Sequence, residues 1–127
     1  MSDKSVAEKL PIKAGYKVLL FNIPPDYKSL LGELPAGTTV LENSTEKADL
    51  IQVFVSSKKE LEYQLSNLKA LLKPKGLLWI TYPKGTSKVK ADINRDSINA
   101  YAQTIGLTGI AMISIDDTWS ALRLKEL

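Results

Sequence analysis

The chain has 127 residues, of which 44% are hydrophobic and 24% charged, and we expect one domain over residues 1–127. It contains neither cysteine nor histidine, which excludes a Ser-His-Asp triad, a cysteine nucleophile, disulfide bonds and a conventional structural zinc site. We therefore expect no metal site and no histidine general acid or base. The net charge of +3 is too small to indicate a polyanionic partner.

Apolar runs alternate with helical spacings along the chain, which is the pattern of a βαβ protein. Asn94 is the predicted N-cap of the last helix. Only three residues separate the last two apolar runs, so these runs must pair antiparallel. In chain order the predicted elements are a helix over 5–10, a strand over 17–22, a helix over 24–34, strands over 38–42 and 49–55, a helix over 57–73, a strand over 77–82, a helix over 94–105, and strands over about 108–115 and 119–125.

The helix over 57–73 has the most clearly marked ends. Ser57 and Glu60 have the S-x-x-E spacing of a capping box, in which each side chain accepts a backbone N–H at the start of the helix. Lys69 and Lys73 are expected in its last turn, where cations favour the helix dipole. The proline and glycine within 74–76 are expected to end the helix.

These elements predict an α/β fold of three layers, Rossmann-like, with a mostly parallel sheet, helices on both faces and a C-terminal antiparallel hairpin. Ligands of such sheets bind beyond the carboxyl ends of the strands, where the strand order reverses. That rule nominates residues 22–26, 42–44, 56–57 and 82–88 as ligand-binding segments.

Three segments resemble class I S-adenosylmethionine-dependent methyltransferases. The segment 71–80, LLKPKGLLWI, and the final hairpin resemble their second half, in which a helix ending in L-K-P-G-G leads into a strand and a hairpin closes the sheet. The segment 49–54, DLIQVF, is similar to the strand before that helix. The resemblance implies a methyltransferase-like fold and nominates Glu42, at the end of the second predicted strand, as a ribose-binding acid; the alternative is a solvated surface residue.

The cofactor turn of those methyltransferases is missing. After the first strand they carry D/E-x-G-x-G, whereas residues 21–27 read FNIPPDY and contain no glycine. Such a turn needs residues with a positive φ and free backbone N–H groups. Proline cannot adopt a positive φ and has no N–H to donate, so the prolines of this segment meet neither requirement. We expect no bound cofactor, and we expect Phe21, Pro24 and Pro25 to fill the crevice if cofactor binding has been lost.

The sequence resembles more closely a small bacterial family that is known only as a domain of unknown function. Its members read similarly to GYKVLLFNIPPDY, LWITYPKGTSKVKADI and DDTWSALRL, over roughly residues 6–125. This resemblance implies the same truncated methyltransferase-like fold and supplies no activity.

The loop after the strand over 77–82 is rich in hydrogen-bond donors. Lys84, Ser87 and Lys88 lie in it, and Asn22 is expected to face the same crevice. Ammonium, hydroxyl and amide groups of this kind bind phosphates or carboxylates, so the loop predicts a site for a small anionic ligand. The alternative is a solvated crossover loop, and the segment lacks the G-x-x-x-x-G-K-[ST] pattern of a P-loop.

Other charged segments favour structural interpretations. Residues 58–90 hold eight lysines and two acidic residues, but the arginines and strand-spaced aromatics that read bases are missing, so nucleic-acid binding is not expected. Asp116 and Asp117 are expected to form the hairpin turn, because no third metal ligand accompanies them. No apolar run approaches the roughly 20 residues of a membrane span, and the N-terminus has no signal-peptide core. We therefore expect a cytoplasmic protein without a membrane partner.

The first hypothesis is a non-catalytic binding or interaction domain with a degenerate methyltransferase-like fold, which holds a small anionic ligand and forms a homodimer through its terminal hairpin. The alternative is an active S-adenosylmethionine-dependent methyltransferase with an atypical pocket that uses Glu42.

Overall fold

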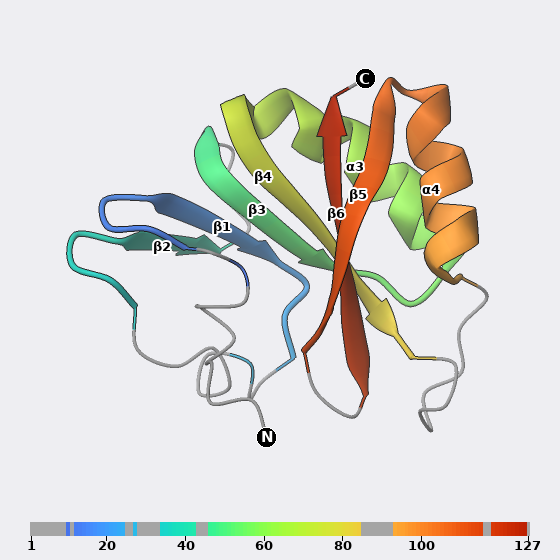
Figure 1. Cartoon of the computed structure of the whole chain (residues 1–127), viewed down its shortest axis with the longest axis horizontal. Helices are drawn as coiled ribbons and strands as arrows, with labels where there is room; N and C mark the ends of the chain where they lie inside the picture. Colours follow the sequence, from blue (N-terminus) through green and yellow to red (C-terminus); the bar gives the residue numbers. More distant parts are fainter. Residues whose placement is uncertain are drawn as a thin grey trace.

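A computed structural model of the chain describes residues 10, 12–24, 27, 34–42, 46–84, 93–115 and 118–126, with only the backbone of Lys75. Its centre is a six-stranded sheet in the order β2-β1-β3-β4-β6-β5 (Figure 1). Neighbours among β1 to β4 run parallel, and β6 runs antiparallel to both β4 and β5. The strands are β1 (Lys17–Phe21), β2 (Thr39–Glu42), β3 (Ala48–Phe54), β4 (Leu72–Pro83), β5 (Leu107–Ser114) and β6 (Trp119–Glu126). This architecture confirms the predicted α/β fold with its mostly parallel sheet and terminal hairpin.

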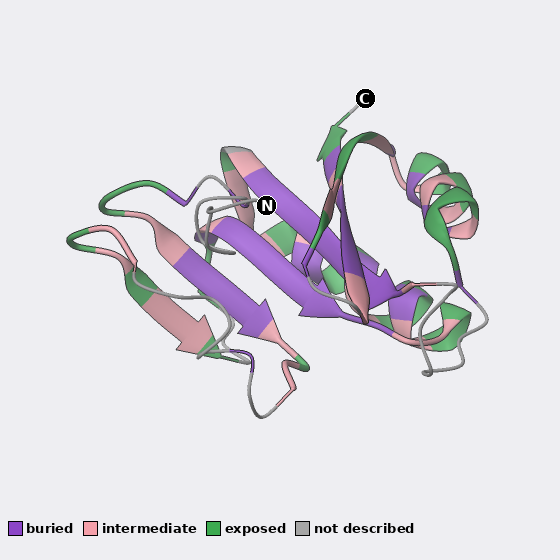
Figure 2. Cartoon of the chain, turned by 60° about the horizontal axis from the view of Figure 1, so that its bottom comes forward, coloured by how far each residue is buried: buried purple, intermediate pink, exposed green. Residues whose placement is uncertain are grey.

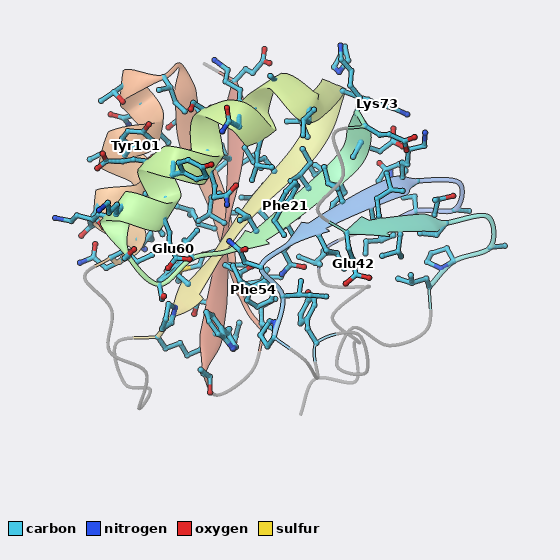
Figure 3. All side chains as sticks on the ribbon, turned by 180° about the vertical axis from the view of Figure 1, so that it is seen from behind. Phe21, Glu42, Phe54, Glu60, Lys73 and Tyr101 are labelled. Atoms are coloured by element: carbon cyan, nitrogen blue, oxygen red, sulfur yellow. The ribbon has the colours of Figure 1, made fainter. Side chains whose placement is uncertain are left out.

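Two helices, α3 (Lys58–Leu71) and α4 (Arg95–Thr104), cover one face of the sheet (Figures 1 and 3). The leucines that recur along α3 and the apolar residues of α4 are buried against the strands because helical spacing places each set on one side. The two helices are also tied together: the ammonium of Lys69 donates to the carbonyl oxygen of Ile105, just after α4, at 2.6 Å. The buried residues contributed by the helices are Leu61, Leu65, Leu68, Ile98 and Ala102.

The opposite face of the sheet is covered by residues from the N-terminal part of the chain. Leu10, Ile12 and Tyr27 are buried there against the central strands. The helices predicted over 5–10 and 24–34 lie outside the described residues, apart from the single positions above and Pro24 and Leu34, so helices on this second face stay a prediction. Figure 2 shows β1, β3 and β4 buried at the centre, between the more exposed edge strands β2 and β5.

The predicted helix caps are confirmed with one difference. The Asn94 side chain accepts from the backbone N–H of Ser97 at 2.9 Å, and Ser97 accepts in return from the Asn94 N–H. The Ser57 hydroxyl accepts from the Glu60 N–H at 3.1 Å, as expected. The Glu60 carboxylate, however, accepts from the backbone and hydroxyl of Ser56, one residue earlier than the capping box requires.

The predicted boundary between α3 and β4 was wrong. The helix ends at Leu71, and strand pairing begins with Leu72 opposite Ala48, so Lys73 lies in the strand rather than in the last helical turn. Gly76 allows close packing: a Cβ there would lie 2.8 Å from the carbonyl oxygen of Lys73 in the same strand and 3.0 Å from that of Asp49 in β3. Tertiary pairing with β3 therefore decides where the strand begins, and local helix-stop signals do not.

Candidate functional site

The strand order reverses between β1 and β3, since β1 continues the sheet toward β2 and β3 continues it toward β4. In open α/β sheets this switch point opens a crevice beyond the carboxyl ends of the two strands, where ligands bind. The crevice is therefore bounded by the residues that follow Phe21 and Phe54, at the end of the sheet where the arrowheads of β1 and β3 lie in Figure 1.

Three aromatic rings gather at this end of the sheet. The Tyr27 and Phe54 ring centroids lie 4.6 Å apart, and those of Phe54 and Trp119 lie 5.0 Å apart, both in edge-to-face contact. Tyr27 and Phe54 are each only 2% exposed. Edge-to-face pairs of this kind add about 0.5–1.5 kcal/mol each beyond the burial of their area. We call these three residues the aromatic plug; Figure 3 shows Phe54 at the end of β3.

A buried chain of hydrogen bonds fixes the plug to the sheet. The Tyr27 hydroxyl donates to Oε1 of Gln52, and Nε2 of Gln52 donates to the Thr81 hydroxyl at 2.8 Å. Gln52 and Thr81 are fully buried on adjacent strands. A polar residue in the middle of a buried strand is tolerated only when its donors and acceptors are satisfied. Gln52 thus holds Tyr27 in place across 25 residues of sequence.

Of the three residues expected to fill the crevice, the structure describes Phe21 and Pro24. Phe21 packs against the core on the α3 and α4 side of the sheet, so it does not line the crevice face that carries Tyr27 and Phe54. Pro24 is half-buried, and Pro25 lies outside the described residues. The sequence contained no local signal for the plug, because its rings come from three elements that are far apart in the chain.

Asn22 and Glu42 lie at the carboxyl ends of neighbouring strands. Glu42 is the last residue of β2 and is paired in register with Leu20, two residues before Asn22. Both side chains are exposed, and Figure 3 shows Glu42 pointing away from the sheet core. Asn22 adopts a φ of +56°, a left-handed conformation that asparagine tolerates better than most residues. A left-handed turn therefore follows β1 even though no glycine is present there.

Lys84 lies two strands away from Asn22, at the end of β4. Its ammonium donates to the Ser114 hydroxyl at 2.7 Å, and its backbone N–H donates to the Thr118 carbonyl at 2.7 Å. These bonds join the end of β4 to the β5–β6 connection. Ser87 and Lys88, the other members of the predicted anion site, lie outside the described residues, as do Asp116 and Asp117. The anion site accordingly stays a prediction.

A groove of about 490 Å³ lies beside Lys84, between the end of β4 and the start of α4. Inside it, the Tyr82 hydroxyl donates to the Met112 sulfur at 3.0 Å, a weak acceptor. Burial raises the pKa of Tyr82 above its ordinary value of 10.0, so its phenol is neutral at physiological pH. Only Tyr82 and Lys84 of this groove fall in a segment that the sequence predicts as ligand-binding, because the other lining residues come from the start of α4 and the hairpin. Its lining residues are Tyr82, Lys84, Asn94, Arg95, Asp96, Met112 and Ser120.

Two further features concern metals and membranes. Within the described ranges, no group of three or more acidic side chains is placed to hold a metal ion. Neither described helix is both long and apolar enough to cross a membrane.

The comparisons with known proteins find similarity in structure alone. No protein-family model matches the sequence, and no curated protein matches it, so the resemblance to the small bacterial family stays a prediction. The complex of DhpI with SAH superposes with a TM-score of 0.65 at 10% identity, over 96% of this chain and 82% of that one. A SAM-dependent methyltransferase from Aquifex aeolicus gives 0.63 at 15% identity, over 94% and 86%.

A longer enzyme shows the same core. The mitomycin 7-O-methyltransferase MmcR matches with a TM-score of 0.66 at 7% identity, over 97% of this chain and 53% of its own. At such identities the likeness is one of fold. Over nearly its whole length, the chain has the methyltransferase-like α/β fold of class I S-adenosylmethionine-dependent methyltransferases.

Proposed function

We propose that the chain is a non-catalytic binding or interaction domain built on a methyltransferase-like fold. The observation that carries this proposal is the aromatic plug: the chain's own rings pack together at the carboxyl end of β3, where we infer that they occupy the space a cofactor would need. The chain also lacks histidine and cysteine, the residues most often used as general bases and activated nucleophiles at neutral pH.

A small anionic ligand near Lys84 is part of this proposal. Lys84 and Arg95 both line the groove at the end of β4, and Asp96 partly offsets their charge through a 3.7 Å ion pair with Arg95. A ligand bound there would reach the start of the loop that carries Ser87 and Lys88. This groove lies on the α4 side of the sheet, away from the plug, so binding there leaves the plug intact.

An active S-adenosylmethionine-dependent methyltransferase is the second candidate function. Two observations favour it: Asn22 supplies a left-handed turn after β1, and Glu42 ends the neighbouring strand, where an acid would meet a ribose. For this candidate the plug must open, because the crevice is occupied by Tyr27 and Phe54.

Thermal denaturation with millimolar S-adenosylhomocysteine or S-adenosylmethionine separates the two candidates. A ligand present at 100 times its Kd stabilises the native state by about 2.7 kcal/mol, which raises Tm by on the order of 10 °C for a domain of this size. We expect no shift with either compound. A saturable shift that disappears in Glu42→Ala would overturn the non-catalytic proposal in favour of the methyltransferase.

The same assay tests the anionic ligand, with phosphorylated metabolites, nucleotides and carboxylates as probes. A compound that binds beside Lys84 should lose its Tm shift in Lys84→Ala and keep it in Lys59→Ala, which removes an exposed lysine of α3. Each shift is taken relative to the same variant without ligand, because Lys84 also bonds Ser114. Equal shifts in the two variants contradict the site.

A further inference from the structure

The edge strand β5 is the most exposed apolar element that the structure describes. It ends the sheet, with β6 as its neighbour on one side. Its residues from Ile110 to Met112 are all exposed, and the Ile110 and Met112 side chains are 42% and 49% exposed. An edge strand presents unpaired backbone N–H and C=O groups along its free side, so it is a template for pairing with another strand.

The two edges of the sheet are built differently. At the opposite edge, β2 is four residues long and ends in the exposed Glu42, and both features discourage pairing with another chain. By contrast, β5 is eight residues long and contains no charged residue and no proline. A bulge between Gly109 and Ala111 interrupts its first half, and residues 111–114 continue in regular register with β6. This regular, uncharged second half is the part suited to pairing.

The helix and strand at this edge carry few charges, and the ammonium of Lys84 reaches the end of β5 at Ser114. The twenty residues 95–114, which form α4 and β5, contain two charged residues, Arg95 and Asp96, where about five would be average for a chain that is 24% charged. These two form an ion pair with each other at 3.7 Å. In a two-fold dimer, a charged residue near the axis lies close to the same residue of the partner, and the two like charges repel. A surface with few charges therefore suits pairing with a second copy of itself.

We propose that β5 pairs antiparallel with β5 of a second copy of this chain, which joins the two sheets into one. A two-fold axis perpendicular to the sheet keeps the faces aligned, so Met112 lies opposite the partner's Met112, and Ala111 lies opposite the partner's Ile113. In this register the pairs among residues 111–113 are apolar, Ser114 lies opposite the partner's Ile110, and β5 brings no like charges together. Both copies of α4 then lie on one face of the joined sheet.

The groove between α4 and β5 gives the joined sheet a contact beyond backbone hydrogen bonds. It measures about 370 Å³ and is lined by Gly109 to Met112, by Leu122 of β6 and by Arg95, Asp96 and Asn99 of α4. The partner's Met112 projects on this face, since its side chain occupies the same side of the sheet. The flexible thioether chain of methionine fills irregular gaps of this kind.

Sedimentation equilibrium and light scattering test the proposal across a concentration series reaching the millimolar range. The wild-type chain is expected to reach twice the 14.0 kDa mass of the monomer. Met112→Lys places two ammonium groups opposite each other at the axis and should raise the dimer Kd at least about tenfold. Because Met112 is 49% exposed, the folded monomer should tolerate the lysine, which circular dichroism and Tm check.

Two control variants separate the interface from other effects. Met112→Leu also removes the sulfur that accepts the Tyr82 hydroxyl, but it keeps an apolar side chain, so it should still dimerise. Tyr63→Lys adds the same charge on α3, where Tyr63 is 72% exposed, and should leave the dimer Kd unchanged. A monomeric wild type at millimolar concentration overturns the proposal, and so does an equal loss of affinity in both lysine variants. These masses are measured without ligand, so they are independent of the proposed function.

Discussion

Replacement of Tyr27 by phenylalanine tests whether the plug is held by a buried hydrogen bond. Tyr27→Phe removes the hydroxyl and keeps the ring, so the edge-to-face contact with Phe54 at 4.6 Å remains. The change falls on Gln52, whose Oε1 loses the hydroxyl that donates to it. Gln52 is 0% exposed, so water cannot replace that hydroxyl. The variant therefore isolates the polar anchor of the plug from its apolar packing.

The expected loss follows from the burial of Gln52. Leaving a buried acceptor unsatisfied costs about 1–3 kcal/mol, more than the net 0.5–1.5 kcal/mol that a typical hydrogen bond contributes. For a chain of 127 residues this corresponds to a fall in Tm of about 3–15 °C. Because Gln52 remains bonded to Thr81, its amide stays oriented toward the vacant position and cannot turn to water.

Urea denaturation followed by tryptophan fluorescence measures this loss as a lower transition midpoint at an unchanged slope. The matched control is Tyr63→Phe, which removes a hydroxyl from a side chain that is 72% exposed and should change the free energy of unfolding by less than about 0.5 kcal/mol. If Tyr27→Phe is no less stable than Tyr63→Phe, the hydrogen bond to Gln52 does not hold the plug.

Substitutions at three further positions test separate parts of the fold. Asn94→Ala removes the N-cap of α4 and should lower the free energy of unfolding by about 0.5–2 kcal/mol in the same urea assay. Asn22→Val forces a β-branched residue into a φ of +56° and should cost about 1–3 kcal/mol, whereas Asn22→Gly should be neutral or stabilising. Tyr82 has a raised pKa in the folded state, so its contribution to stability is present below pH 10.0 and is lost as pH rises through the folded pKa. As the pH rises above 10, the free energy of unfolding should therefore fall more steeply for the wild type than for Tyr82→Phe. Phenolate absorbance should show that Tyr82→Phe removes a tyrosine that ionises late.

Local patterns predicted the elements whose causes are local. The N-cap at Asn94 depends on one side chain and the backbone N–H three residues later, so it could be found in the sequence. The buried strands were equally visible, because a strand covered on both faces carries a nearly continuous apolar run. The start of β4 could not be found in the sequence, since Leu72 joins the sheet by pairing with Ala48, which lies 24 residues earlier.

The candidate site depended on contacts that no local pattern encodes. Gln52 is a single polar residue in an apolar strand, and its partner Tyr27 lies in a segment that the sequence suggested only as a helix start. Pairing of Phe54 with Trp119 joins the end of β3 to the start of β6. The missing glycines after β1 pointed to a lost cofactor turn, and the structure places a left-handed residue, Asn22, directly after β1 without a glycine. The absence of glycine therefore did not predict the backbone conformation of the residue that follows β1.

The plug also lowers the apparent affinity of any ligand that enters the crevice. To make room, Tyr27 must leave its buried position, which forfeits about 1.5–3 kcal/mol of ring burial, about 0.5–1.5 kcal/mol from its hydrogen bond and a similar amount from its contact with Phe54. The total of about 2.5–6 kcal/mol means that the open state is rare, and the apparent Kd rises by roughly 10²–10⁴-fold. A cofactor with micromolar intrinsic affinity would then bind only at roughly 0.1–10 mM. Tyr27→Ala removes this barrier, so tighter binding of S-adenosylhomocysteine by that variant than by the wild type would show that the crevice keeps its affinity and that the plug alone closes it.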